Sequence, residues 1–417
     1  RDDLVTGVQT CALPISFQNV SFEQMNNVLY ISNGIDHVMK YDGNKIYRAG
    51  LPGLVDNVIP GTWAYSSAPV YSTGSGSIHS GTYYYKFVIE YTDDKGNTIT
   101  SHPSDPEELT HSSNVNVTWS LQQFVFAHLD KDATKLKFSV YRSKSVSNGG
   151  SATGLFYKVG TASYNQTVTD STIDADLTAN DLLVEPIKRH DPPPKGAYLT
   201  KFKDCLVIAG QSDNVNNVSY SLPFNAATSE IGSEYFPDDD NAVIVNSSFG
   251  TKITAIAPLR DLLYIFHEDS IHVLAGDISD PVGLPFTVDL LTNEGGLGCI
   301  THHSITEFQN NLVFLSSQGY FSINSSSALQ ELSAIINPIF NDKDLVMKRA
   351  VTFNWTDRDL LMMIIPKEET VSSNIYTTSN SLILAYDYFR GAWLQWDSLD
   401  FSAGIAISNN NVFFMSR

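Results

Sequence analysis

The sequence predicts an all-β protein. Its 20 tyrosines and 22 phenylalanines, together with many Val, Ile and Thr residues, favour pleated and half-buried strands. Asn, Ser, Asp and Gly fill the gaps between the short apolar runs, as turns require. No segment beyond roughly three turns repeats its apolar residues at helical spacing. The best helical candidate, "LSAIINPIFND" (Leu332–Asp342), is interrupted by Pro338.

A recurring strand motif predicts that most of the chain forms an incomplete β-propeller of about five to six blades. Each copy has a short apolar strand, a polar turn and a second, alternating strand, as in "NVLYISNGIDHVMKY" (Asn27–Tyr41) and "LLYIFHEDSIHVL" (Leu262–Leu274). Later copies begin at residues 206, 262, 312, 360 and 412, which are 56, 50, 48 and 52 residues apart. Neighbouring blades would cover both faces of each sheet, which explains why Leu360–Ile365 is apolar throughout.

Residues 63–190 break this repeat and predict an inserted immunoglobulin- or fibronectin-III-like β-sandwich. In "GTYYYKFVIEYTDDKGNTIT", alternate residues from Tyr83 to Tyr91 share one face, and Asp94–Asn97 supplies a hairpin turn. Further short strands follow, and the segment contains no cysteine pair. We therefore expect residues 17–62 to form the first blade and residues 191–417 to form the remaining blades.

The opening of the chain differs from the rest. "VTGVQTCALPI" (Val5–Ile15) has neither strand alternation nor a helical stripe, and it lacks the features of a signal peptide. These eleven residues are identical to the translation of a common sequencing-library adapter. We interpret residues 1–16 as an adapter-derived artefact that takes no part in the fold. The chain also stops one strand into a repeat, so truncation at both ends is expected.

The charge and the cysteines limit the classes of function. Arg1, Asp2 and Asp3 contribute −1 to the formal net charge of −19, so the remaining chain carries −18. Affinity for nucleic acid comes mainly from Lys and Arg, so this balance argues against a phosphate-binding outer surface. No apolar run approaches the roughly 18 residues that a membrane span needs. Cys205 and Cys299 are predicted to be buried small hydrophobes rather than a disulfide or metal ligands.

The acidic and histidine clusters favour structural interpretations. Asp238, Asp239 and Asp240 form the densest acidic run, but consecutive strand residues cannot all face one pocket. A solvated turn is therefore favoured over a metal or catalytic site, and the three residues are kept only as candidate contact positions. His302 and His303 are adjacent, so on a strand they would point to opposite faces and could not share a metal.

Trp393 and Trp396 in "GAWLQW" are the other candidate contact residues, because their rings could stack on a sugar. Their spacing of three places them on opposite faces of a strand, which favours core packing. The chain contains no HExxH, GxSxG or P-loop motif, and "GGLGC" (Gly295–Cys299) is a weak nucleotide signal. We therefore predict no enzyme activity, no cofactor and no metal.

The order of these parts resembles the tail-hub, nozzle or stabilisation proteins of short-tailed bacteriophages. The resemblance covers nearly everything from Phe17 onward. The matching segments are "LYISNGIDHVMKYDG", "RAGLPG", "GTYYYKFVIEYTDDKGNTITSHPSDP", "KLKFSVYRSK", "DPPPKGAYLTKFKDCLVIAG…VSYSLPFN", "ITAIAPLRDLLYIFHEDSIHVLAG", "GGLGCITHHSI…NLVFLSSQGYF" and "AYDYFRGAWLQW". The resemblance implies a virion structural protein, assembled in the bacterial host cytoplasm, that forms a homo-oligomeric ring in the tail or head-to-tail connector. It also implies contacts with other tail and portal proteins, and with passing DNA that is not bound sequence-specifically. No catalytic residues are carried over.

A DNA conduit should repel DNA weakly, and a net charge of −18 is compatible with an acidic lumen. Two alternatives stay open. A carbohydrate-binding propeller at a cell or virion surface would expose an aromatic cluster. Its main support would be removed by burial of the five tryptophans, which are Trp63, Trp119, Trp355, Trp393 and Trp396. A glycan-active propeller enzyme would need at least two carboxylates that converge in the central funnel.

Overall fold

The computed structural model describes residues 20–51, 70–120, 131–146, 154–163, 166–184, 190–223, 232–237, 241–276, 286–367, 369–372, 375–377, 381–396, 403–407 and 411–415. Residues 1–16, which we interpret as an adapter-derived artefact, lie outside these ranges. Within them the protein is all-β, as predicted, and its single α-helix is the short α1 (Asp174–Leu177). No helix in the described ranges has the length and apolar character needed to cross a membrane.

Five sheets share one plan, in which four antiparallel strands follow one another in chain order. The first contains β1 (Ser21–Met25), β2 (Val28–Ser32), β3 (Met39–Tyr41) and β4 (Ile46–Arg48). The second contains β13 (Tyr198–Phe202), β14 (Cys205–Ala209), β15 (Asn217–Tyr220) and β16 (Ala242–Ile244). The third contains β17 (Ile253–Leu259), β18 (Leu262–His267), β19 (Ile271–Gly276) and β20 (Phe286–Thr292).

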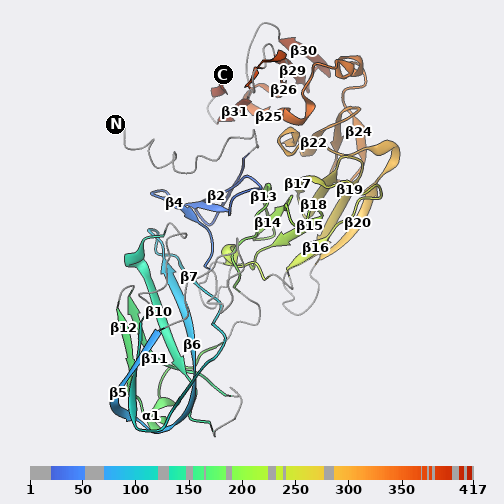
Figure 1. Cartoon of the computed structure of the whole chain (residues 1–417). Coiled ribbons are helices and arrows are strands. Elements are labelled where there is room, and N and C mark those ends of the chain that lie inside the picture. Colours follow the sequence, from blue (N-terminus) through green and yellow to red (C-terminus); the bar gives the residue numbers. More distant parts are fainter. Residues whose placement is uncertain are drawn as a thin grey trace, which may run out of the picture.

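The fourth sheet contains β21 (Thr306–Phe308), β22 (Asn311–Ser316), β23 (Gly319–Ile323) and β24 (Leu329–Glu331). The fifth contains β25 (Val351–Trp355), β26 (Leu360–Ile365), β29 (Leu382–Asp387) and β30 (Ala392–Trp396). Two hairpins accompany it, which are β27 (Glu369–Ser372) with β28 (Ile375–Thr377) and β31 (Ala403–Ile407) with β32 (Asn411–Met415). All the sheets are open, and the five follow one another along an arc (Figure 1).

In four of the five four-stranded sheets, a two-residue turn joins the first two strands, whereas residues 356–359 connect β25 to β26. Asn26 and Asn27 both have positive φ, and so do Lys203 with Asp204 and Gln309 with Asn310. Positive φ at both central residues defines the type I′ turn, whose twist matches a hairpin. The apolar motifs that begin at residues 206, 262, 312 and 360 are therefore the second strands of their sheets, each preceded by a first strand that the motif does not include.

The second strands are buried on both faces because neighbouring sheets cover them. On β14, Leu206 and Ile208 pack with residues of the first sheet, such as Tyr30. Val207 and Ala209 point the other way and pack with side chains of the third sheet. This two-sided burial is the physical reason for the continuous apolar runs in the sequence.

Two further sheets, here called the paired sheets, lie between β4 and β13 in the chain (Figure 1). One contains β5 (Val70–Ile78), β9 (Val115–Ser120) and β12 (Thr167–Asp170). The other contains β6 (Gly81–Thr92), β7 (Thr98–Thr100), β8 (Glu107–His111), β10 (Leu136–Arg142) and β11 (Tyr157–Ser163). They share one core, and the alternate residues of β6 face it as predicted, which are Tyr83, Tyr85, Phe87, Ile89 and Tyr91.

Two local expectations are wrong. His302 and His303 lie in a 3₁₀ turn, η6 (His302–Ser304), and not on a strand, so their rings come within 5.6 Å of each other. Pro338 does not interrupt a helix but stands in the first turn of a 3₁₀ helix, η7 (Asn337–Asn341). Proline is tolerated there because the first N–H groups of a helix have no intrahelical acceptor.

Candidate functional site: a buried ionic junction

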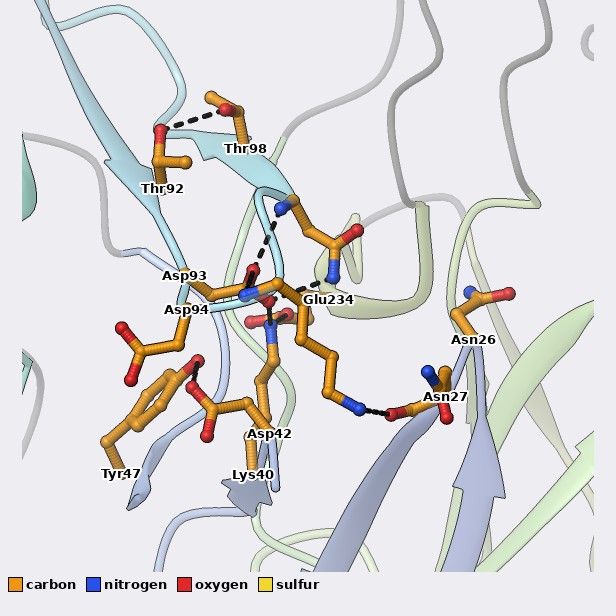
Figure 2. A network of polar contacts seen from close by, with 12 residues as sticks. Asn26, Asn27, Lys40, Asp42, Tyr47, Thr92, Asp93, Asp94, Thr98 and Glu234 are labelled. Carbon is orange, nitrogen blue, oxygen red and sulfur yellow. Dashed lines mark hydrogen bonds and ion pairs between the residues drawn. The ribbon is translucent and has the colours of Figure 1, made fainter. Parts of the chain in front are cut away.

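The most concentrated buried charge in the described residues surrounds Lys40 on β3 (Figure 2). Its Nζ lies 2.6 Å from Oε1 of Glu234 and 3.1 Å from Oδ2 of Asp93, and none of the three side chains is more than 2% exposed. Glu234 belongs to the 3₁₀ turn η4 (Gly232–Glu234), and Asp93 follows β6. The first sheet, the paired sheets and the segment before β16 therefore meet at one ammonium group, which we call the ionic junction.

Asp93 is held in position by its own turn. Its Oδ1 accepts the backbone N–H groups of Lys95 at 2.9 Å and Asn97 at 2.8 Å, and its Oδ2 accepts the Asn97 amide at 2.9 Å. In turns, an aspartate carboxylate commonly accepts hydrogen bonds from backbone N–H groups a few residues further along the chain. The hairpin turn predicted at "TDDKGN" is thus confirmed, and its first carboxylate also serves the ionic junction.

The second oxygen of Glu234 joins two loops of the chain. Oε2 accepts the N–H of Gly50 at 2.6 Å. Gly50 has φ +77°, and a Cβ there would stand 2.8 Å from Cα of Pro192. Only glycine fits this approach. Glu234 therefore fixes the backbone of Gly50 where it lies against Pro192, so two segments on either side of the paired sheets meet here.

The electrostatics keep all three groups charged. Burial alone would lower the pKa of Lys40, but the neighbouring carboxylates, Glu234 foremost, raise it above its ordinary value. Burial alone would raise the pKa of Glu234, but Lys40 and Lys131 outweigh that effect and lower it. The pKa of Asp93 is likewise lowered, because Lys40 and Asn97 overcome its burial. A charged triad excluded from water is stable only while every member keeps its partners.

Further contacts fix the β6–β7 turn to the first sheet. The Lys95 ammonium donates to the carbonyl of Asn27 at 2.6 Å, and the Asn44 amide donates to Asp94 at 2.6 Å. The ring of Tyr47 on β4 packs edge-on against Tyr91 on β6, with centroids 5.6 Å apart. These contacts surround the ionic junction and restrict how the paired sheets can move against the first sheet.

Tyr235, beside Glu234, reinforces the same connection. Its hydroxyl accepts the backbone N–H of Thr100 on β7 at 2.8 Å. Its ring stacks on His190 with centroids 3.8 Å apart, and it contributes to the core of the paired sheets. Glu234 at the end of η4 thus contacts the first sheet, and the next residue, Tyr235, contacts the paired sheets.

The structure describes only some of the candidate contact residues that the sequence indicates. Asp238, Asp239 and Asp240 lie outside the described residues. Trp393 and Trp396 occupy opposite faces of β30, as predicted, and contribute to two different cores. Trp393 also donates its ring N–H to the carbonyl of Leu332 at 3.2 Å.

The other tryptophans behave similarly where they are described. Trp119 is buried at the centre of the paired sheets, and Trp355 packs against the core that also receives Trp396. Trp63 lies outside the described residues. The described indole rings therefore do not form an exposed aromatic cluster.

Cys205 and Cys299 are buried and unbridged, as predicted. Within the described ranges, no group of three or more His, Cys, Asp and Glu side chains is placed to hold a metal ion.

Comparison with known proteins does not assign the chain to a family. No protein family and no curated protein matches the sequence. Among solved structures, the computationally designed Ika8 protein matches with a TM-score of 0.31 and 11% identity, over 95% of this chain and 93% of its own.

Two further matches come from B. thetaiotaomicron. The extracellular domain of a putative one-component system has a TM-score of 0.24 and 10% identity over 97% of this chain. The extracellular domain of a putative hybrid two-component system has a TM-score of 0.32 and 10% identity over 96% of this chain. The chain spans about half the length of these two, 50% and 53%. At such low TM-scores, the matches assign neither a family nor an activity.

Proposed function

We propose that the chain is a structural protein of a bacteriophage virion, part of a ring or nozzle around the DNA conduit of the tail. In this proposal the four-stranded sheets are blades of an incomplete β-propeller, and the paired sheets are an inserted fibronectin-III-like sandwich. The strand contacts support the propeller, because first strands of successive sheets touch, β1 with β13, β13 with β17, β21 with β25, and β25 with β31. Between the third and fourth sheets, β17 contacts η6, the turn that precedes β21. The resemblance of the sequence to tail-hub proteins supports the role.

The single observation that carries the structural role is the ionic junction. Lys40, Asp93 and Glu234 are each buried and charged, and each is fully engaged in joining segments that are distant in the chain. Such a joint gives a defined orientation between two bodies rather than a place for a substrate. A ring that surrounds a passing polymer needs its parts held in fixed orientations.

The charge of the chain supports the conduit. Without residues 1–16, the net charge of −18 repels the phosphate backbone of DNA, so DNA would slide past and not adhere. The described tryptophans favour this role over the carbohydrate-binding alternative, because Trp119 is buried and Trp355, Trp393 and Trp396 are partly buried against cores. No specific observation favours a glycan-active enzyme.

The proposal is tested by the assembly state of the purified chain. We expect light scattering after size exclusion to give a mass of several subunits, and negative-stain images to show closed rings. A monomer at every concentration reached would contradict the proposal. In the same preparation, duplex DNA should not bind at physiological ionic strength, and tight salt-sensitive binding would contradict the conduit.

A further inference from the structure

A cavity of about 340 Å³ opens where four of the five sheets approach one another. Its walls come from the β2–β3 loop at Asn33, the start of β13 at Tyr198, the start of β17 at Lys252, and η6 at His303. The volume falls in the range of small-molecule sites in proteins. The cavity lies apart from the ionic junction and shares none of its residues.

One wall of the cavity is made of backbone that is rigidly positioned. The Gly34 N–H donates to the carbonyl of Gly196 at 2.9 Å, and the Ala197 N–H donates to the carbonyl of Ala209 at 2.9 Å. Gly210 has φ +70°, and a Cβ there would stand 2.7 Å from the ring of Tyr198. Such close packing leaves this wall little freedom to relax, so the cavity is preformed.

The opposite side is also fixed by polar contacts. The Thr254 hydroxyl donates to the carbonyl of Cys299 at 2.6 Å, which ties β17 to the segment that enters η6. Glu268 in the β18–β19 turn pairs with Lys348 at 2.9 Å. This exposed pair neutralises one positive and one negative charge at the rim.

Lys252 is then the cation that decides the charge of the cavity. It is exposed and has no carboxylate partner in the described part of the chain. The cavity therefore carries a net positive charge in a protein whose formal net charge is −19. An anion would therefore be attracted to this cavity, although the net charge of the protein repels anions.

The remaining lining groups favour a ligand with hydroxyls. Burial lowers the pKa of His303, so its ring is neutral at pH 7 and offers one donor and one acceptor nitrogen. Thr301 and Gln211 also belong to the lining, and the Gln211 amide donates one N–H to the Ser219 hydroxyl at 2.8 Å. Hydrogen-bond donors and acceptors beside one cation match a hydroxylated carboxylate better than a lipid or an aromatic ring.

We propose that this cavity binds a small polyhydroxylated monocarboxylate, with the carboxylate on Lys252 and the hydroxyls on Thr301, His303 and Gln211. A site of this kind gives the protein a binding activity that is independent of its assembly into a ring. The proposal therefore stands or falls separately from the virion role.

Titration calorimetry on the full chain tests the site with D-glucuronate, D-galacturonate and D-gluconate, and with methyl glucoside as a neutral probe. We expect saturable binding of at least one carboxylate, and binding of the neutral probe that is about tenfold weaker or undetectable, since a charge-assisted hydrogen bond contributes roughly this factor. If none of the three carboxylates binds saturably, the proposal is overturned.

Two lysine variants distinguish binding in this cavity from nonspecific attraction of anions to any lysine. Lys252→Gln should weaken carboxylate binding about tenfold, and Lys137→Gln on the exposed face of β10 should leave it unchanged. Thr301→Val, which keeps the side-chain shape, should weaken binding at an unchanged thermal midpoint. Equal losses in both lysine variants, or no loss in Lys252→Gln, would show that the cavity is not the binding site.

Discussion

Lys40 on β3 and Asp93 in the turn after β6 form an ion pair of 3.1 Å from which water is excluded on both sides. The two residues belong to different sheets and are brought together only by the tertiary fold. Glu234 completes the ionic junction from a third part of the chain. The orientation of the paired sheets against the first sheet therefore depends on one ammonium group.

Removing that ammonium should destabilise the protein severely. Lys40→Met leaves two carboxylates buried without their cation, and breaking a buried ion pair typically costs about 3–5 kcal/mol. Urea denaturation followed by tryptophan fluorescence measures the loss. Lys367→Met is the matched control, because its 2.9 Å pair with Asp342 is about one-third exposed, at 35% and 37%, and should contribute at most about 1 kcal/mol. Similar losses in both variants would refute the importance of the junction.

The protein should lose stability as the pH falls below about 6.5. Burial lowers the pKa of His302 to about 3, with a smaller effect from His303, and burial lowers the pKa of His37 to about 4. The folded state thus binds fewer protons than the unfolded state, so the contribution is complete above pH 6.5 and declines towards these values. Urea midpoints at a series of pH values should reveal the slope.

A histidine variant tests whether His302 causes this dependence of stability on pH. His302→Phe should lose less stability between pH 6.5 and pH 4.5 than the unchanged protein, because one neutral buried imidazole is absent. His79→Phe, at an exposed position, should keep the original slope. If His302→Phe keeps it too, protonation of His302 does not contribute to the acid response.

Trp119 should dominate the core of the paired sheets. Its ring lies 4.9 Å from both Tyr85 and Phe87, measured between centroids, and it is 1% exposed. Trp119→Ala should reduce the free energy of unfolding by about 3–5 kcal/mol, and Trp119→Phe by less. Phe389→Ala, at a ring that is 77% exposed, should change it by no more than about 0.5 kcal/mol. A small effect at Trp119 would mean that these sheets do not share the core described.

Cys205 and Cys299 should resist alkylation in the native protein. Both are buried, and burial raises the pKa of the Cys299 thiol to about 12, so almost no reactive thiolate exists at neutral pH. Iodoacetamide labelling followed by peptide mass mapping should modify both only after unfolding. Rapid native labelling of either cysteine would place it at the surface.

The sequence predicts the strands and their faces well, because both follow from local periodicity. The alternation from Tyr83 to Tyr91 and the opposite orientation of Trp393 and Trp396 are confirmed for this reason. Some first strands of the four-stranded sheets are harder to detect. β21 (Thr306–Phe308), for example, is short and partly exposed, and it lacks the apolar run of the second strand.

The ionic junction could not be derived from the sequence, because its partners meet only through tertiary structure. One signal is present in retrospect, since Lys40 stands two residues after the buried Val38, at the spacing of one strand face. A lysine on an apolar face requires a buried carboxylate. Which carboxylate fulfils that requirement is not encoded locally, and neither Asp93 nor Glu234 differs in pattern from acidic turn residues elsewhere.

The most direct test of the ionic junction measures the distance between the paired sheets and the first sheet. Spin labels would be placed on exposed positions by Gln24→Cys on β1 and Lys137→Cys on β10, with Cys11→Ser to remove a competing thiol. Pulsed dipolar spectroscopy should give one narrow distance distribution, which broadens in Lys40→Met and in the milder Asp93→Asn. A broad distribution with the junction intact, or an equally narrow one in both variants, would contradict the conclusion that Lys40, Asp93 and Glu234 fix this orientation.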